Sequence, residues 1–236
     1  MATAKKTVAK ATESAVPATQ HVSRGVSSEI SEEDLLLPRI ELTQPTSPSV
    51  LEEKHKAGIY INSITKDPLP SNTIIPILVT KNYIRWKPRN EGGGIIYRTT
   101  NSNDPRVQED IKWHGQEKPL CTQYINVVCM VVGEEMPIVC SFANTSYQAG
   151  RKLLTIVKMT NKDAWLSSYT LKAVRKSNAK GTFYVMDIDR AGASTPEEAA
   201  KGAALYAMFS NVKDINMDYA QDAPTQTTTE GLSDEF

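Results

Sequence analysis

The sequence predicts a mainly β fold with helices, in a barrel-like arrangement. Two β-hairpins flank one helix, and a second helix follows the last hairpin. Three observations predict this order. Several segments rich in β-branched residues are bounded by Gly and Pro, two pairs of them are joined by short turns, and helical periodicity appears between those pairs.

The first half of the chain is expected to form strands at 57–65, 72–88 and 93–99, each rich in β-branched residues. Pro76 lies inside the second segment and has no N–H to donate, so it predicts an edge or a bulge at that point. A polar loop of about twenty residues, 100–122, follows and contains Trp113 and His114.

The second half predicts two hairpins around a helix. Segments 122–132 and 136–142 flank "GEE" and predict the first hairpin, and segments 165–177 and 182–191, with Gly181 at the turn, predict the second. Between them, Ala149, Leu153, Ile156 and Val157 are spaced as the buried stripe of a helix over 146–159.

The C-terminal helix over 194–212 has the clearest start signal. Thr195 is the expected cap, Pro196 takes the first helical position and Glu198 completes a capping box. Several strands, one helix and two further strands is the order of an oligonucleotide/oligosaccharide-binding (OB) barrel, and other small barrels and α+β sheets have a similar order.

Three parts of the chain are expected from its composition: a disordered arm at 1–33, one basic domain at 34–218, and a flexible acidic tail at 219–236. No run approaches the roughly 18 apolar residues of a membrane helix, so we expect no membrane partner. Three cysteines without a CxxC pair favour a reducing cytoplasm.

The charge is divided unevenly, although the net charge of the chain is zero. Residues 1–53 hold five basic and eight acidic side chains, a net of −3, and residues 191–236 hold two and eight, a net of −6. Residues 54–190 hold twenty basic and eleven acidic side chains, a net of +9. A basic middle indicates polyanion binding, and an acidic end indicates a segment that competes for the same surface.

Binding of a single strand requires cations along a groove and aromatic faces for bases. On a strand through "KNYIRWKPR", Lys81, Tyr83, Arg85 and Lys87 share a face, and Trp86 points the other way. The alternative is that these are ordinary solvent-facing cations and core aromatics. The candidate nucleic-acid-binding residues are Lys81, Tyr83, Arg85, Trp86, Lys87, Arg89, Arg98, Lys112, Trp113, Tyr169, Lys172, Arg175, Lys176 and Lys180.

Signals of catalysis are weaker. Asp187 and Asp189 alternate on the last predicted strand and offer two carboxylates to Mg²⁺, although exposed aspartates on a final strand are common. The three histidines are far apart, and "EGGG" lacks the lysine and the helix of a phosphate loop. We therefore expect no enzyme, no cofactor and no metal site.

The chain ends in "SDEF" after the polar spacer "QDAPTQTTT". An acidic pair and a terminal Phe on a polar leash resemble the tails of single-stranded DNA-binding proteins of bacteria and, more closely, of their phages. The runs "DLLLPRIELTQPTSPSV" and "YIRWKPRNEGGG" also resemble phage replication-region proteins. The chain departs from the bacterial family in its sparser acidic tip and larger folded part.

This resemblance implies an OB-like core that binds single-stranded DNA without sequence preference in phage replication or recombination, in the host bacterial cytoplasm. It implies that Asp234, Glu235 and Phe236 recruit replication or recombination proteins. The alternative is a phage structural or assembly protein that multimerises through its β-rich body, marked by an exposed apolar face. The helix at 196–212 offers an oligomer interface in either case, or packs on the core.

Overall fold

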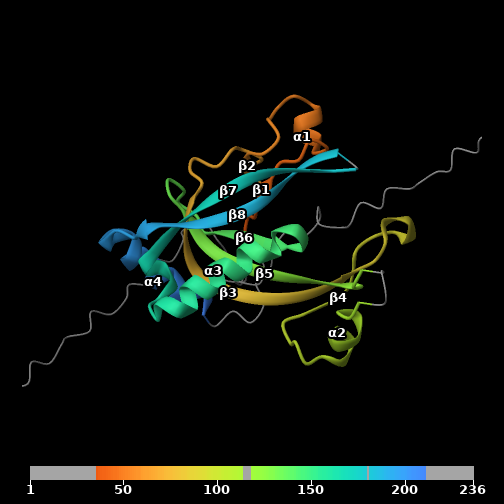
Figure 1. The fold of residues 1–236 in the computed structure, drawn as a ribbon. Helices are drawn as coiled ribbons and strands as arrows, with labels where there is room; N and C mark the ends of the chain where they lie inside the picture. Colours follow the sequence, from red (N-terminus) through yellow and green to blue (C-terminus); the bar gives the residue numbers. More distant parts are fainter. Residues whose placement is uncertain (1–35, 114–117, 180, 211–236) are drawn as a thin grey trace, which may run out of the picture. The chain divides into compact units, whose positions relative to one another are not determined.

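The structure is a computed structural model that describes residues 36–113, 118–179 and 181–210, and it confirms the mainly β class with helices (Figure 1). The strands of the main sheet are antiparallel, in the order β6-β5-β3-β7-β8 with β4 paired to β3. They are β3 (Thr73–Trp86), β4 (Ile95–Thr99), β5 (Cys121–Val131), β6 (Ile138–Ala143), β7 (Ser167–Asn178) and β8 (Gly181–Ala193).

The predicted hairpins and helices are confirmed. The hairpins β5–β6 and β7–β8 flank α3 (Tyr147–Thr160) in the sequence, and α4 (Pro196–Phe209) follows β8. The capping box of α4 is present, with the Thr195 hydroxyl accepting from the Glu198 N–H and the Glu198 carboxylate accepting from the Thr195 N–H. No helix in the described ranges is long and apolar enough to cross a membrane.

The bulge predicted at Pro76 is also confirmed, and it lies in a central strand. The register between β3 and β5 shifts between Pro76 and Leu78. Before the shift, β3 pairs with β7 at Thr73 and Ile74; beyond it, β3 continues along β5 and then β4. A bulge bends the strand that carries it. β3 therefore runs away from β7 after this point (Figure 1).

The predicted barrel does not close, and this part of the prediction is corrected. β6 and β8 are the end strands of the sheet order, and no pairing between them occurs in the described residues. The segment of β1 (Ile40–Leu42), which pairs with β2 (Tyr60–Asn62), contacts both instead. Arg39 forms a parallel bridge to Val139, and the side chain of Gln44 bonds the backbone of Tyr184. A segment outside the five-strand order thus occupies the seam between β6 and β8.

The core lies on both faces of the sheet because alternate strand residues point in opposite directions. On one face, Ile125, Val127 and Phe142 pack with Leu153 of α3. This helix approaches the sheet closely: a Cβ placed on Gly150 would lie 2.7 Å from the Cβ of Phe142. On the other face, a second cluster packs against α4, and its buried members are Ile75, Ile77, Ile84, Tyr124, Val128, Met130 and Val139.

The segment at 100–122, predicted as a loop, contains a helix, α2 (Pro105–Asp110). Asp104 caps it by accepting from the Arg106 N–H at 3.0 Å, and Pro105 takes its first position. Its fully buried Val107 packs with Tyr83 and Tyr97. Six residues with one such apolar side chain are too few to produce a helical period, so only the Asp-Pro start signal could have indicated α2.

Candidate nucleic-acid interface

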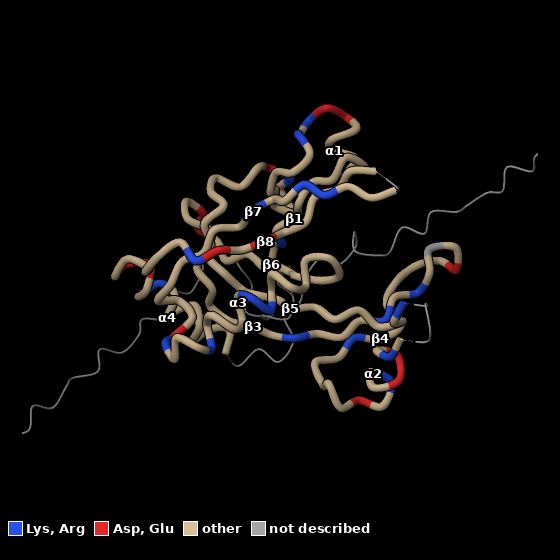
Figure 2. The backbone as a smooth tube through the Cα atoms, viewed as in Figure 1, with Lys and Arg blue, Asp and Glu red and all other residues tan. Residues whose placement is uncertain are grey.

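Two strand arms carry most of the predicted cations. We define the β3–β4 arm as residues 81–99 and the β7–β8 arm as residues 172–185. The β7–β8 arm ends at the turn before Gly181, and the β3–β4 arm at the glycine-rich turn before Ile95. Both tips project toward the same side in Figure 1, and Lys and Arg residues mark both arms in Figure 2.

On the β3–β4 arm, the structure separates exposed cations from structural ones. Lys81 and Lys87 are exposed. Tyr83 is 6% exposed and packs beneath α2, so its assignment as a base-stacking residue is corrected. Arg85 faces the same helix and donates from Nη1 to both oxygens of Asp110 at 3.0 Å. The predicted shared face exists, but α2 covers part of it.

Asp110 joins α2 to the arm. Its buried carboxylate accepts a hydrogen bond of 2.7 Å from the hydroxyl of Tyr97 in addition to the bonds from Arg85. Burial, and then the hydrogen bond to Asp110, raises the pKa of Tyr97 well above its ordinary range. The guanidinium of Arg106 lies 4.8 Å from the Tyr97 ring centre and pairs with Asp104 at 2.8 Å. Arg85 and Arg106 therefore stabilise the arm itself.

Trp86 points to the opposite face, as predicted, and packs at the edge of the α4-side cluster, with its indole N–H 3.2 Å from the hydroxyl of Tyr124. Arg98 is half-buried. Beyond α2, Lys112 is exposed and Trp113 is 66% exposed, which leaves an indole face available to a base. The side chain of Arg89 lies outside what the structure describes.

Two predicted residues at or just before the base of the β7–β8 arm have structural roles. Tyr169 is 1% exposed in the core, so its predicted contact with nucleic acid is corrected. Lys172 donates to Asp189 at 2.5 Å, and Lys152 of α3 donates to the other oxygen of the same carboxylate at 2.5 Å. The hydrogen bond from Lys152, followed by that from Lys172, lowers the pKa of Asp189 to about 2.

The same lysines affect whether Asp187 and Asp189, the pair considered for Mg²⁺, could coordinate a cation. Lys152 lies 3.5 Å from Asp187 as well as contacting Asp189. Ammonium groups therefore occupy the coordination directions that a cation would need. Within the described ranges, no group of three or more His, Cys, Asp or Glu residues could hold a metal ion.

The tip of the β7–β8 arm places cations beside aromatic rings. Arg175 lies opposite Tyr184 and Lys176 opposite Phe183, so each pair shares a face of the hairpin. Arg175 and Lys176 are both exposed, and neither forms an ion pair with another residue of the described chain. Lys180, at the turn, lies outside the described residues. This tip carries the predicted mixture of cations and aromatic residues.

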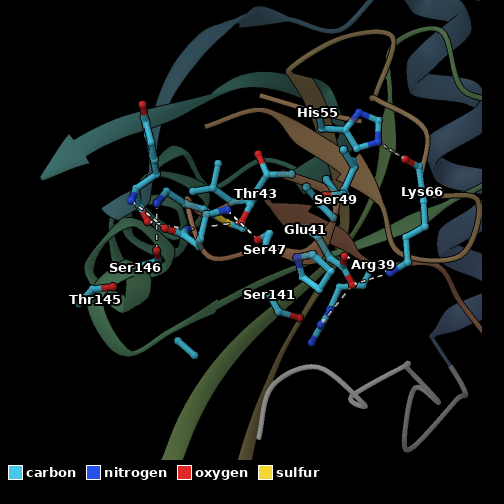
Figure 3. A pocket seen from close by; sticks show the side chains of 18 of the residues that line it. Arg39, Glu41, Thr43, Ser47, Ser49, His55, Lys66, Ser141, Thr145 and Ser146 are labelled. Atoms are coloured by element: carbon cyan, nitrogen blue, oxygen red, sulfur yellow. Dashed lines mark hydrogen bonds and ion pairs between the residues drawn. The ribbon is translucent and has the colours of Figure 1, made fainter. Parts of the chain in front are cut away.

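A cleft of about 550 Å³ lies at the seam between β6 and β8 (Figure 3). β1 and the segment after it, the end of β6, the turn η3 (Asn144–Ser146) and β8 form its walls. Sequence analysis missed it because four segments far apart in the chain create it. Its polar lining includes Arg39, Glu41, Thr43, Ser47, Ser49, His55, Lys66, Ser141, Thr145, Ser146 and Tyr184.

The sheet order and the two arms define a mainly β protein with helices, built on an open six-stranded antiparallel sheet. Residues 6–215 match the family described as Pam3 phage gp34-like protein. The chain belongs to this family and is a phage protein. No curated protein and no solved structure matches it.

Proposed function

We propose that the protein binds single-stranded DNA without sequence preference during phage DNA replication or recombination. The tip of the β7–β8 arm is the observation that carries the proposal, because exposed Arg175 and Lys176 lie beside Tyr184 and Phe183. Cations along the strand backbone and aromatic faces against bases are the two requirements for such binding. Phosphate contacts supply its sequence-independent part.

The second arm supports the same proposal. Lys81 is exposed on β3, Lys87 is exposed directly after that strand, and Trp113 offers an exposed ring beyond α2. A single strand has unstacked bases that can reach such a ring, whereas a duplex keeps its bases paired. We therefore expect preference for the single strand. Protection of the strand needs no reaction, and we propose no catalytic activity and no cofactor.

Fluorescence anisotropy with a labelled dT oligonucleotide and a duplex of equal length tests the proposal. The variant Arg175→Ala/Lys176→Ala should bind the single strand more weakly. Its slope of log affinity against log salt should fall by about 1.4, since each phosphate contact to a single strand contributes about 0.7. Lys158→Ala/Lys162→Ala removes the same charge from exposed positions at the end of α3 and should leave the slope unchanged. Equal slopes in all three proteins, or absence of binding, would contradict the proposal.

The C-terminal tip belongs to the same proposal, although it lies outside the described residues. Asp234, Glu235 and Phe236 would recruit replication or recombination proteins once DNA displaces the acidic tail from the basic arms. Deletion of residues 230–236 should preserve or tighten DNA binding and abolish recruitment of such a partner. A loss of DNA affinity after the deletion would refute the idea that the tail competes with DNA.

An assembly role is the second candidate, and a feature of β4 favours it. Ile95 is 43% exposed and Ile96 52% exposed, and within the described chain β4 pairs only with β3. Exposed apolar residues on an edge strand promote association. Two results together would favour this role over DNA binding. The protein would show no affinity for oligonucleotides, and light scattering would show an oligomer that the variant Ile96→Lys dissociates.

A further inference from the structure

We propose that the single strand makes a further contact at the start of α3, where it crosses from one arm to the other. Arg151 binds a phosphate there, and the side-chain amide of Gln123 donates a hydrogen bond to a base. This inference rests on the proposed function and adds residues that the charge pattern did not indicate. Three features of this surface support it: its position between the arms, an amide with unused hydrogens, and cations without acidic partners.

The start of α3 connects the bases of the two arms. The hydroxyl of Ser146, directly before the helix, accepts from the N–H of Met186 at 3.0 Å, and Met186 directly follows the β7–β8 arm. The hydroxyl of Tyr147 donates to Oε1 of Gln123 at 2.9 Å, and Gln123 on β5 pairs with Tyr83 of the β3–β4 arm. In Figure 1, α3 lies alongside β5 between the two arms. The direct path of a strand from one arm to the other therefore passes over the start of this helix.

The register of the sheet places Gln123 and Lys81 on the face that α3 covers. Ile125 lies on this face, where a Cβ added to Gly150 of α3 would lie 3.1 Å from its Cβ. Gln123 lies two residues before Ile125 on β5, so the two side chains point the same way. Lys81 of β3 is the cross-strand partner of Ile125 and shares that face. Gln123 and Lys81 are therefore diagonal neighbours, about 7–8 Å apart.

The amide of Gln123 has hydrogens to donate. Its oxygen accepts from Tyr147, and within the described chain its nitrogen forms no hydrogen bond. Gln123 is only half-buried. Every base carries a hydrogen-bond acceptor on an edge that a single strand leaves unpaired. An amide donor at this point therefore suits a base, and it does so without selecting a sequence.

Arg151 and Lys81 supply positive charge near this amide. Arg151 lies four residues after Tyr147, and residues at this spacing are neighbours on a helix surface. Both cations are exposed, and in the described ranges neither forms an ion pair. Lys152, by contrast, is engaged with Asp189 of β8. The first turn of α3 carries no acidic residue that would repel a phosphate. Arg151 is therefore available to the strand backbone.

The first test is the salt dependence of dT binding in the variant Arg151→Ala. Loss of one phosphate contact should lower the slope of log affinity against log salt by about 0.7. Lys158→Ala removes the same charge from an exposed position in the last turn of α3 and should leave the slope unchanged. Equal slopes in these two variants, with a lower slope in Arg175→Ala/Lys176→Ala, would overturn the contact at α3 and leave the proposed function standing. Absence of oligonucleotide binding by the wild-type chain would refute both.

Two further variants test the amide. Gln123→Ala should weaken dT binding about two- to tenfold, the contribution of one hydrogen bond, and should keep the salt slope because the amide is neutral. Tyr147→Phe keeps the ring and removes the hydroxyl that positions the amide, so it should weaken binding no more than Gln123→Ala does. The variant with both changes should bind as Gln123→Ala does, because the hydroxyl acts only through the amide. Additive losses would contradict this positioning role.

A last measurement does not depend on the variants. Titration of the wild-type chain with the dT oligonucleotide should shift the NMR signals of the Gln123 side-chain amide. In a chain that binds the oligonucleotide, unchanged Gln123 signals would overturn the base contact and leave the proposed function standing.

Discussion

The side chain of Gln44 is the contact whose removal we predict in most detail. Its Nε2 donates to the carbonyl oxygen of Tyr184 at 2.9 Å, and its Oε1 accepts from the Tyr184 N–H at 2.8 Å. The amide therefore takes the place of a strand partner at the edge of β8. Each such hydrogen bond contributes about 0.5–1.5 kcal/mol, so Gln44→Ala should cost about 1–3 kcal/mol of local stability at the seam.

Hydrogen exchange of the Tyr184 amide measures this loss of local stability. Every 1.4 kcal/mol is a factor of ten, so the Tyr184 amide should exchange about five- to a hundredfold faster in Gln44→Ala. The control is Gln148→Ala, because Gln148 is exposed on α3 and makes no hydrogen bond to a side chain in the described part of the chain. Equal exchange of Tyr184 in both variants would refute the argument that Gln44 holds β8 at the seam.

Three further predictions follow from close packing, exposure and charge. Gly150→Ala should lower the unfolding free energy measured in urea. Overpacking against Phe142 costs about 1–3 kcal/mol, and the higher helix propensity of Ala offsets about 1 kcal/mol of that cost. The control is Gly192→Ala, which should have a much smaller effect because a Cβ at Gly192 meets nothing within 4 Å. Trp113→Ala should weaken dT binding by about 1–3 kcal/mol if its ring stacks on a base, and unchanged anisotropy would exclude that contact. The pKa of Asp189 is lowered to about 2, so its carboxylate stabilises the fold at a pH above its ordinary pKa of 3.8, and this stabilisation is lost as the pH falls toward 2. The urea midpoints of wild type and Asp189→Asn should therefore converge as the pH falls from 3.8 toward 2. A constant difference between the two midpoints would contradict the assignment.

The site could be predicted only in part from the sequence. Alternation on a strand correctly placed Tyr83 and Arg85 on one face, because that period is a property of the backbone. Whether a face is exposed depends on what packs over it, and α2 covers these two residues. Tyr169 illustrates the same limit: residue type suggested a stacking face, and the core enclosed it.

Local chemistry by itself determined the order of the main-sheet strands, the two helices α3 and α4, the bulge at Pro76 and the capped start of α4. Each depends on interactions within a few residues: periodicity, a missing N–H, or a side-chain cap. The family assignment places this order in a phage protein. Tertiary structure alone decided that the sheet stays open, that the β1 segment occupies its seam, and that a polar cleft forms there. The reason is that the seam depends on contacts such as Gln44 with Tyr184, which lie 140 residues apart in the chain and leave no local pattern.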